Sequence, residues 1–162
     1  FKRIILYIKH QVFYMGRALC LFISMKLKYD VVSGDFTRAG YASSQIKKTL
    51  KQLGVDPAVI KRVVIALYEA EVNIVAHAYK GVITADIDSA GISVVLADEG
   101  PGIPDLELAM RKGYSTASAA VREMGFGAGM GLPNIKDNAD ELKIDTKVGV
   151  GTTLHIYIKF VK

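Results

Sequence analysis

A helix that is apolar on nearly every side dominates the pattern of this chain. We predict it from the Asp56-Pro57 pair to about Tyr79, with Gly81 as its end. Asp56 can cap the first turn, and proline is tolerated there because the amides of that turn have no partner within the helix. A helix with apolar residues all round is buried. The rest of the chain must therefore supply the layers that cover it.

Two hairpins are predicted to supply most of a sheet. Residues 82–88 alternate between apolar and polar, and Ala90-Gly91 turns the chain into a returning strand. The pattern predicts strands at 27–32, 82–88, 92–97, 142–147 and 152–160. Besides the central helix, it predicts helices at 35–53, 105–112 and 131–139, and Asp35 is expected to cap the helix at 35–53. Hairpins indicate a mixed, mostly antiparallel sheet with helices on one face, which is an α+β two-layer sandwich.

Charge argues against a nucleic-acid partner. The formal net charge is +5, but four of the 21 basic residues lie before Met25. The other 17 face 16 acidic residues, so the rest of the chain is nearly neutral and has no basic stripe. Cys20 is the single cysteine, which excludes an intrachain disulfide and a zinc site built on cysteines. A reducing, cytoplasmic location is expected.

The first 24 residues differ from the rest because they are apolar and basic. Lys9, His10, Gln11 and Arg17 interrupt the apolar run, so no stretch is long enough to span a membrane. We interpret residues 1–24 as an N-terminal extension of doubtful status, an over-extended reading frame with Met25 as the natural start. An amphipathic anchor is the alternative. One domain is then expected over residues 25–162.

Three polar side chains interrupt one face of the apolar helix. Glu69, Asn73 and His77 recur every four residues, so they stack along one side. Such a row indicates either a polar pocket or ordinary hydrogen bonds at a helix surface. In a pocket, a carboxylate can take a proton as a general base while a neighbouring amide oxygen coordinates Mg²⁺.

Two further motifs could shape a nucleotide site. Asp98 follows Ile92, Val94 and Leu96 at every second position, so in a strand it faces the same side as these apolar residues, toward the core. Gly100 and Gly102 have no side chain and would let the backbone approach a flat ring. A carboxylate there can accept a hydrogen bond from the amine of adenine, whereas guanine presents a carbonyl at that position. Thr152 has the parity that places its hydroxyl on the same side as Asp98. The alternative is a pair of plain turns.

The run from Gly125 to Gly131 has glycine at every second position and precedes a predicted helix. Backbone N–H groups of such a loop can surround phosphates at a helix N-terminus, or the loop can serve as the hinge of a lid. No Gly-Lys-Ser/Thr ends the run, so it is not a Walker A loop. It does not follow a strand, as a Rossmann loop would.

In combination, these motifs resemble those of the GHKL, or histidine kinase-like, ATPases with the Bergerat fold. Four motifs occur in the order of that family, over about residues 25–162: Glu69-x-x-x-Asn73, Asp98-x-Gly100-x-Gly102, Gly127-x-Gly129-x-Gly131 and Gly151-Thr152. The resemblance implies ATP and Mg²⁺ as cofactors and a lid over residues 103–126.

The resemblance also assigns roles to single residues. Glu69 would be the general base, Asn73 the Mg²⁺ ligand and Asp98 the partner of the adenine amine. Thr152 would support the adenine through water. Further candidate contacts to ATP are His77 and the glycines of the motifs, together with Lys112, Ser115 and Thr116 of the lid.

Within the family, the sequence is most similar to the RsbW, RsbT and SpoIIAB group of serine/threonine kinases from bacterial partner-switching systems. The segment Glu69–Tyr79 looks like that of anti-sigma kinases, and Gly127–Asn134 looks like that of the switch kinases. The larger relatives have domains that this chain lacks. The implied partners are a STAS-domain antagonist and, for some members, a sigma factor or a downstream phosphatase. A homodimer is a further expectation from the resemblance.

Three alternatives to a serine/threonine kinase stay open. The chain could sequester its partner without phosphorylating it, be the catalytic fragment of a two-component histidine kinase, or be an unrelated α/β domain with chance glycines. Arg38 is a candidate partner contact or a solvated surface residue. Glu71 falls on the buried side of the helix and has no role in the family pattern, so we expect a lysine or arginine to pair with it.

Overall fold

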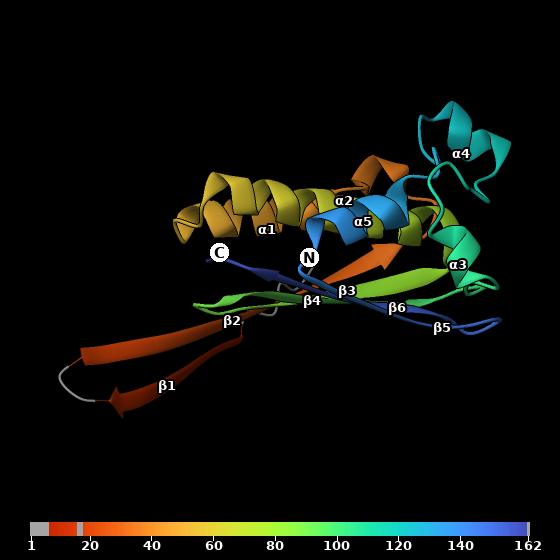
Figure 1. Cartoon of the computed structure of the whole chain (residues 1–162). Helices are drawn as coiled ribbons and strands as arrows, with labels where there is room; N and C mark the ends of the chain where they lie inside the picture. Colours follow the sequence, from red (N-terminus) through yellow and green to blue (C-terminus); the bar gives the residue numbers. More distant parts are fainter. Residues whose placement is uncertain (1–6, 16–17, 162) are drawn as a thin grey trace.

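In the part of the chain that the structure describes, six antiparallel strands form one sheet, and helices cover one of its faces (Figure 1). The computed structural model describes the backbone of residues 7–15 and 18–161. It also describes the side chains of residues 24–119 and 121–161. The strand order is β1-β2-β3-β4-β6-β5, and each neighbouring pair among the described strands is antiparallel. The predicted α+β two-layer sandwich is therefore confirmed.

The elements follow one another along the chain much as the sequence predicts. The strands are β1 (Tyr7–Met15), β2 (Ala18–Val32), β3 (Lys80–Ile87), β4 (Gly91–Glu99), β5 (Glu141–Lys147) and β6 (Gly151–Lys159). The helices are a 3₁₀ turn η1 (Phe36–Arg38), α1 (Tyr41–Gln52), α2 (Pro57–His77), α3 (Leu106–Ala109), α4 (Ala119–Glu123) and α5 (Gly131–Asn138). Of these, β1 and α4 were not predicted. The segment of β1 was interpreted as part of an extension, and that of α4 shows no apolar period.

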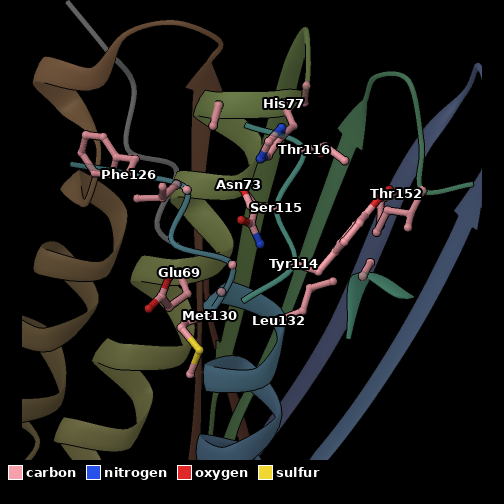
Figure 2. Close-up of a pocket in the computed structure, with 18 of the residues that line it drawn as sticks. Glu69, Asn73, His77, Tyr114, Ser115, Thr116, Phe126, Met130, Leu132 and Thr152 are labelled. Carbon is pink, nitrogen blue, oxygen red and sulfur yellow. The ribbon is translucent and has the colours of Figure 1, made fainter. Parts of the chain in front are cut away.

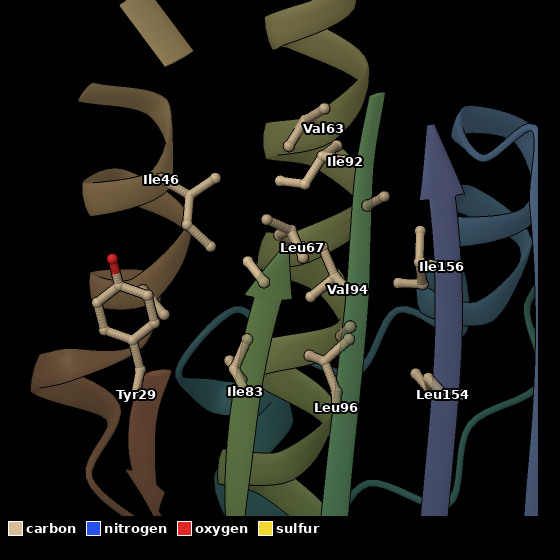
Figure 3. Close-up of a cluster of buried hydrophobic side chains, with 14 of the residues drawn as sticks. Tyr29, Ile46, Val63, Leu67, Ile83, Ile92, Val94, Leu96, Leu154 and Ile156 are labelled. Carbon is tan, nitrogen blue, oxygen red and sulfur yellow. The ribbon is translucent and has the colours of Figure 1, made fainter. Parts of the chain in front are cut away.

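The core lies between the sheet and the layer of α1, α2 and α5. Figure 3 shows side chains of α1 and α2 meeting those of β3, β4 and β6. Ile46 of α1, Val63 of α2 and Ile92 of β4 are each 0% exposed. Burying such a side chain contributes about 1.5–3 kcal/mol relative to leaving it in water. The prediction that α2 is a buried, central helix is confirmed.

Both ends of α2 have clear local causes. The Asp56 carboxylate accepts hydrogen bonds from the backbone N–H groups of Ala58, at 2.7 Å, and Val59, at 3.4 Å, which is the predicted cap. The helix ends at His77, two residues before the predicted end, because Ala78 is extended. The N–H of Tyr79 then donates to the carbonyl of Glu99. His77 is thus the last helical residue.

The helix predicted over 35–53 begins later in the structure. Asp35 starts only the 3₁₀ turn η1, and α1 begins at Tyr41 after Gly40, whose φ is 86°. This left-handed conformation favours glycine. A Cβ at Gly40 would also lie 2.9 Å from the ring of Tyr68. The turn at Gly40 therefore divides a segment that the sequence pattern reads as continuous.

The predicted strand at 27–32 is the C-terminal part of a longer strand. β2 begins at Ala18, so Met25, where we expected the domain to begin, lies inside β2 and pairs with Ile87 of β3. β1 pairs with β2, and this hairpin projects beyond the helical layer (Figure 1). Among the described residues, no helix is both long enough and apolar enough to cross a membrane.

Candidate functional site

A cavity of about 460 Å³ opens between α2, the ends of β4 and β6, and the segment that leads to α5. Its volume lies within the range of small-molecule sites in proteins. It brings together most of the predicted site residues, namely Glu69, Asn73, His77, Asp98, Gly102, Ser115, Thr116, Gly127, Gly129, Gly131 and Thr152. Figure 2 shows Asn73 and His77 on α2, Thr152 on β6, and Ser115 and Thr116 of the lid around this space.

The row on α2 faces this cavity. Glu69, Asn73 and His77 follow one another along the helix, so the predicted shared face is observed (Figure 2). The amide of Asn73 lies close to Gly131, the first residue of α5. A Cβ added at Gly131 would be only 3.1 Å from Oδ1 of Asn73. Glycine at 131 therefore lets α5 approach Asn73 closely. The site places an amide oxygen and a carboxylate one helical turn apart.

His77 is at the exposed rim of the cavity, at the end of α2. Nearby protein atoms displace part of the water around the ring, and this desolvation lowers the pKa of His77 below its ordinary value. The neutral form of the imidazole is thereby favoured over the charged form. A neutral imidazole offers one hydrogen-bond donor and one acceptor, which suits a ligand with groups of both kinds.

Asp98 lies across the cavity from α2 and is tied to β6. Its Oδ1 accepts a hydrogen bond from the N–H of Thr152 at 3.0 Å. Burial raises the pKa of the Asp98 carboxyl, and this hydrogen bond opposes the shift. Its Oδ2 receives no hydrogen bond from the residues that the structure describes, so one acceptor is left for a ligand.

The hydroxyl of Thr152 has a partner that the sequence did not reveal. It lies 3.0 Å from Oγ1 of Thr146, on the neighbouring strand β5. Oγ1 of Thr146 also accepts a hydrogen bond from the N–H of Ile103 at 2.9 Å. Thr146 therefore joins the Asp98 side of the site to the start of the lid. A cross-strand pairing of this kind could have been found only by knowing the register of β5 and β6.

The predicted lid folds against the glycine-rich segment that follows it. Asp105 caps α3 by accepting from the N–H of Leu108 at 2.8 Å, and the N–H of Gly113 donates to the carbonyl of Gly129 at 2.8 Å. Gly129 has a φ of 73°, and a Cβ there would collide with the backbone of Gly113 and Tyr114. The glycine at 129 therefore allows the glycine-rich segment to touch the middle of the lid at Gly113.

An aromatic pair holds the C-terminal end of the lid. The ring of Phe126 packs against Phe36 of η1, with centroids 5.2 Å apart. Phe126 also lines the cavity (Figure 2). Other cavity residues that the sequence did not single out are Tyr68, Val72, Ala76, Ile103, Tyr114, Met130 and Leu132. Their apolar surface suits a flat ring, but apolar residues in a half-buried segment carry no signal of their own.

Two predicted site residues do not line the cavity. Gly100 packs beneath it, where a Cβ would lie 3.0 Å from Cα of Ala78, and its N–H donates to the carbonyl of Val150. Lys112 is exposed, and its Nζ lies 3.6 Å from Oδ2 of Asp137 on α5. Gly100 thus supports the end of β4, and Lys112 lies outside the group of cavity residues.

The expectation that a lysine or arginine pairs with Glu71 is wrong. Glu71 is 3% exposed, and its two oxygens accept hydrogen bonds from the N–H groups of Ala42, at 3.0 Å, and Ser43, at 3.1 Å. These amides belong to the first turn of α1. The N–H groups of a first turn have no hydrogen-bond partner within their own helix. Burial raises the pKa of Glu71, and the hydrogen bonds oppose this shift. Glu71 is the cap of α1, supplied by α2.

The donor set of the cavity fits a magnesium ion that is shared with a phosphate ligand. Among the described residues, no group of three or more histidine, cysteine and acidic side chains could hold a metal. Mg²⁺ does not need such a group, because it keeps several waters and takes one or two protein oxygens together with substrate phosphates. Asn73 Oδ1 and the Glu69 carboxylate lie on one face of α2 and are oxygen ligands of the right kind.

Comparison with known proteins agrees with this geometry. Residues 33–158 match the histidine kinase-like ATPase domain family. The serine/threonine-protein kinase RsbT of Bacillus subtilis (strain 168) is 33% identical over 112 residues, which cover 67% of this chain and 78% of that protein. An anti-sigma F factor of Clostridium acetobutylicum is 30% identical over 145 residues, covering 84% and 93%. One from Thermoanaerobacter sp. (strain X514) is 33% identical over 109 residues, covering 63% and 73%. The chain belongs to the histidine kinase-like ATPase family.

Proposed function

We propose that this protein binds ATP with Mg²⁺ in the cavity and transfers the γ-phosphoryl group to a serine or threonine of a partner protein. The observation that carries this proposal is the arrangement of Glu69 and Asn73 on one face of α2, with Asp98 across the same cavity. The similarity to a serine/threonine-protein kinase and to anti-sigma factors supports it.

Asp98 and Asn73 are assigned to opposite ends of the nucleotide. The Oδ2 of Asp98 accepts from the exocyclic amine of adenine, and the glycine-rich segment from Gly127 to Gly131 offers backbone N–H groups to the phosphates. Asn73 Oδ1 is assigned as the protein ligand of Mg²⁺. When bound, the ion neutralises charge on the phosphates.

Glu69 is assigned to the incoming hydroxyl. Its carboxylate orients the serine or threonine side chain and accepts the hydroxyl proton as the new O–P bond forms and the bond between the γ-phosphorus and the ADP oxygen breaks. Ser115 and Thr116 of the lid line the cavity and provide hydroxyl donors. Phosphoryl transfer depends mainly on positioning and charge neutralisation, which is what these groups provide.

The proposed substrate is a STAS-domain antagonist, and the setting is a bacterial partner-switching system in the cytoplasm. The similarity to anti-sigma F factors favours a second activity, the binding of a sigma factor. Exposed Arg38, which stacks on the Tyr41 ring at 5.3 Å, is the assigned contact for a protein partner. The proposed alternative function is sequestration of the partner without phosphorylation.

The test is calorimetric titration of ATP with Mg²⁺ into the protein and its Asp98→Asn variant, with GTP as the control nucleotide. Replacing an acceptor by an amide should weaken ATP binding about 10- to 100-fold, because a hydrogen bond to a charged group is lost in a partly buried site. GTP should not bind measurably. No binding of ATP to the unmodified protein would contradict the proposal. Transfer of acid-labile phosphate to histidine, in place of acid-stable phosphate to a partner, would favour a histidine kinase.

A further inference from the structure

The Glu69 carboxylate is held by a side chain that no motif of the sequence pointed to. Nδ2 of Asn134, on α5, lies 2.7 Å from Oε1 of Glu69. The two residues are 65 positions apart, and only the packing of α5 on α2 brings them together. A carboxylate can accept but not donate, so the NH₂ group of Asn134 must face it.

The position of Asn134 is fixed by its neighbours on α5. Pro133 and Ile135, on either side of it, are buried, and Ile135 is 0% exposed. The N–H of Asn134 donates to the carbonyl of Met130, and its carbonyl accepts from Nδ2 of Asn138, each at 2.8 Å. Its amide is therefore presented to Glu69 from an anchored helix and not from a mobile loop.

The hydrogen bond leaves the other oxygen of Glu69 for the reaction. A Cβ at Gly131 would lie 3.6 Å from Oε2 of Glu69, so this oxygen is at the start of α5, where the glycine-rich segment ends. Figure 2 shows Glu69 beside this junction, on the side where Met130 lies. One carboxylate oxygen is thus tied to α5, and the second lies beside the cavity.

We propose that Asn134 is a positioning residue, which orients the Glu69 carboxylate toward the incoming hydroxyl. This inference rests on the proposed phosphoryl transfer by Glu69. Because Asn134 and the phosphate-binding glycines belong to one continuous segment from Gly127 onward, the orientation of the general base depends on the placement of α5 against the nucleotide. Asn134 itself is not one of the residues that line the cavity.

The first experiment separates positioning from binding. Asn134→Leu keeps the size of the side chain and removes the donor, and kcat for phosphoryl transfer should fall about 10-fold or more, as expected when a general base loses its alignment. The Kd for ATP with Mg²⁺, measured by calorimetry, should change less than twofold. The control is Lys136→Leu, which makes the same kind of change at an exposed position of the same helix. It should keep kcat within about twofold.

The second experiment asks whether Asn134 acts through Glu69. In a Glu69→Gln background, Asn134→Leu should cause no further loss of kcat, because the base that it positions is already absent. A full additional loss in that background would overturn the proposal, as would an unchanged kcat in the single variant. Parallel losses of kcat and ATP affinity would also overturn it, because they would indicate a structural role.

A third readout does not depend on activity. Urea unfolding of Glu69→Leu, Asn134→Leu and the double variant should show non-additive shifts of the midpoint, because either single change breaks the same hydrogen bond. Additive shifts would overturn the proposed contact. If the unmodified protein binds ATP but transfers no phosphate, the proposed function fails. Retained coupling in unfolding would then show that the contact is structural only, which overturns the positioning role.

Discussion

Glu69 and Glu71 are two residues apart on α2, yet the fold gives them opposite surroundings. The carboxylate of Glu69 lines the cavity and bonds to a side chain, Asn134. The carboxylate of Glu71 is buried on the other side of the helix and bonds to two backbone N–H groups of α1. Residue type alone therefore does not distinguish the proposed general base from the structural carboxylate. What distinguishes the two is whether the carboxylate has access to the cavity.

The two sides of α2 therefore have different tasks. The side that faces α5 and the lid carries the proposed chemistry, and its polar atoms are partly exposed. The side that faces α1 replaces the missing N-terminal cap of that helix, which begins after Gly40 without any capping side chain of its own. Substitutions at Glu69 and Glu71 should accordingly affect different measurable quantities.

The largest expected effect is that of Glu69→Gln on the chemical step. Loss of a general base lowers kcat by about 10²- to 10⁴-fold. The amide oxygen at position 69 can still accept from Asn134, so the free energy of unfolding should change by less than about 1 kcal/mol. The measurement is transfer of labelled phosphate to a partner protein, paired with urea unfolding. A variant with normal kcat would remove the proposed distinction between the two carboxylates.

The second effect, that of Glu71→Ala, should appear in stability. Removing the cap leaves two buried N–H groups without partners, which should lower the free energy of unfolding by about 2–3 kcal/mol. Glu71→Gln keeps one acceptor oxygen and should cost about 1 kcal/mol. Urea denaturation measures both, with exposed Glu123→Ala of α4 as the control, expected within about 0.5 kcal/mol of the unmodified protein. If Glu71→Ala changed kcat more than stability, the assignment of a structural role would be wrong.

The smallest effect is the pH dependence that Glu71 contributes. Its pKa in the folded protein is raised above the ordinary value of 4.5, so between these two values the folded protein binds more protons than the unfolded chain. The resulting stability is fully present below pH 4.5 and is lost as pH rises through the folded pKa. The free energy of unfolding of the unmodified protein minus that of Glu71→Gln should therefore fall over this window.

Asp145 provides a control of opposite sign for this pH experiment. A hydrogen bond and charge attraction from Lys143, with a further contribution from His155, lower the pKa of Asp145 below 3.8. The stability it contributes is present above pH 3.8 and is lost as pH falls through its folded pKa. The corresponding difference for Asp145→Asn should rise with pH. Differences of the same sign for the two variants would contradict the assigned shifts.

Much of the site could be predicted from the sequence because its motifs are local. The spacing of Glu69, Asn73 and His77 follows from the period of one helix, and the parity of Asp98 and Thr152 follows from the period of two strands. Both periods survive folding, since they depend only on backbone geometry. The glycines at 127, 129 and 131 line the cavity as expected.

The predictions that failed concerned contacts between distant segments. Glu71 was expected to pair with a basic side chain, but its partners are amides of α1 some 28 residues away in the chain. Gly40 ends one helix-like segment and allows another to begin, which the apolar pattern does not show. Thr146 and Asn134 gained their roles from strand register and helix packing, which no local pattern contains.

The sequence by itself determined most of the elements, the buried character of α2 and the residue types that face the cavity, because hydrophobic period and turn chemistry act over a few residues. Only the tertiary structure decided which polar groups meet. The packing of α5 on α2 gives Glu69 its partner, and the packing of α1 on α2 gives Glu71 its two amides. The physical reason is that a buried polar group must find a hydrogen-bond partner, and the three-dimensional arrangement of the helices sets which partner is within reach.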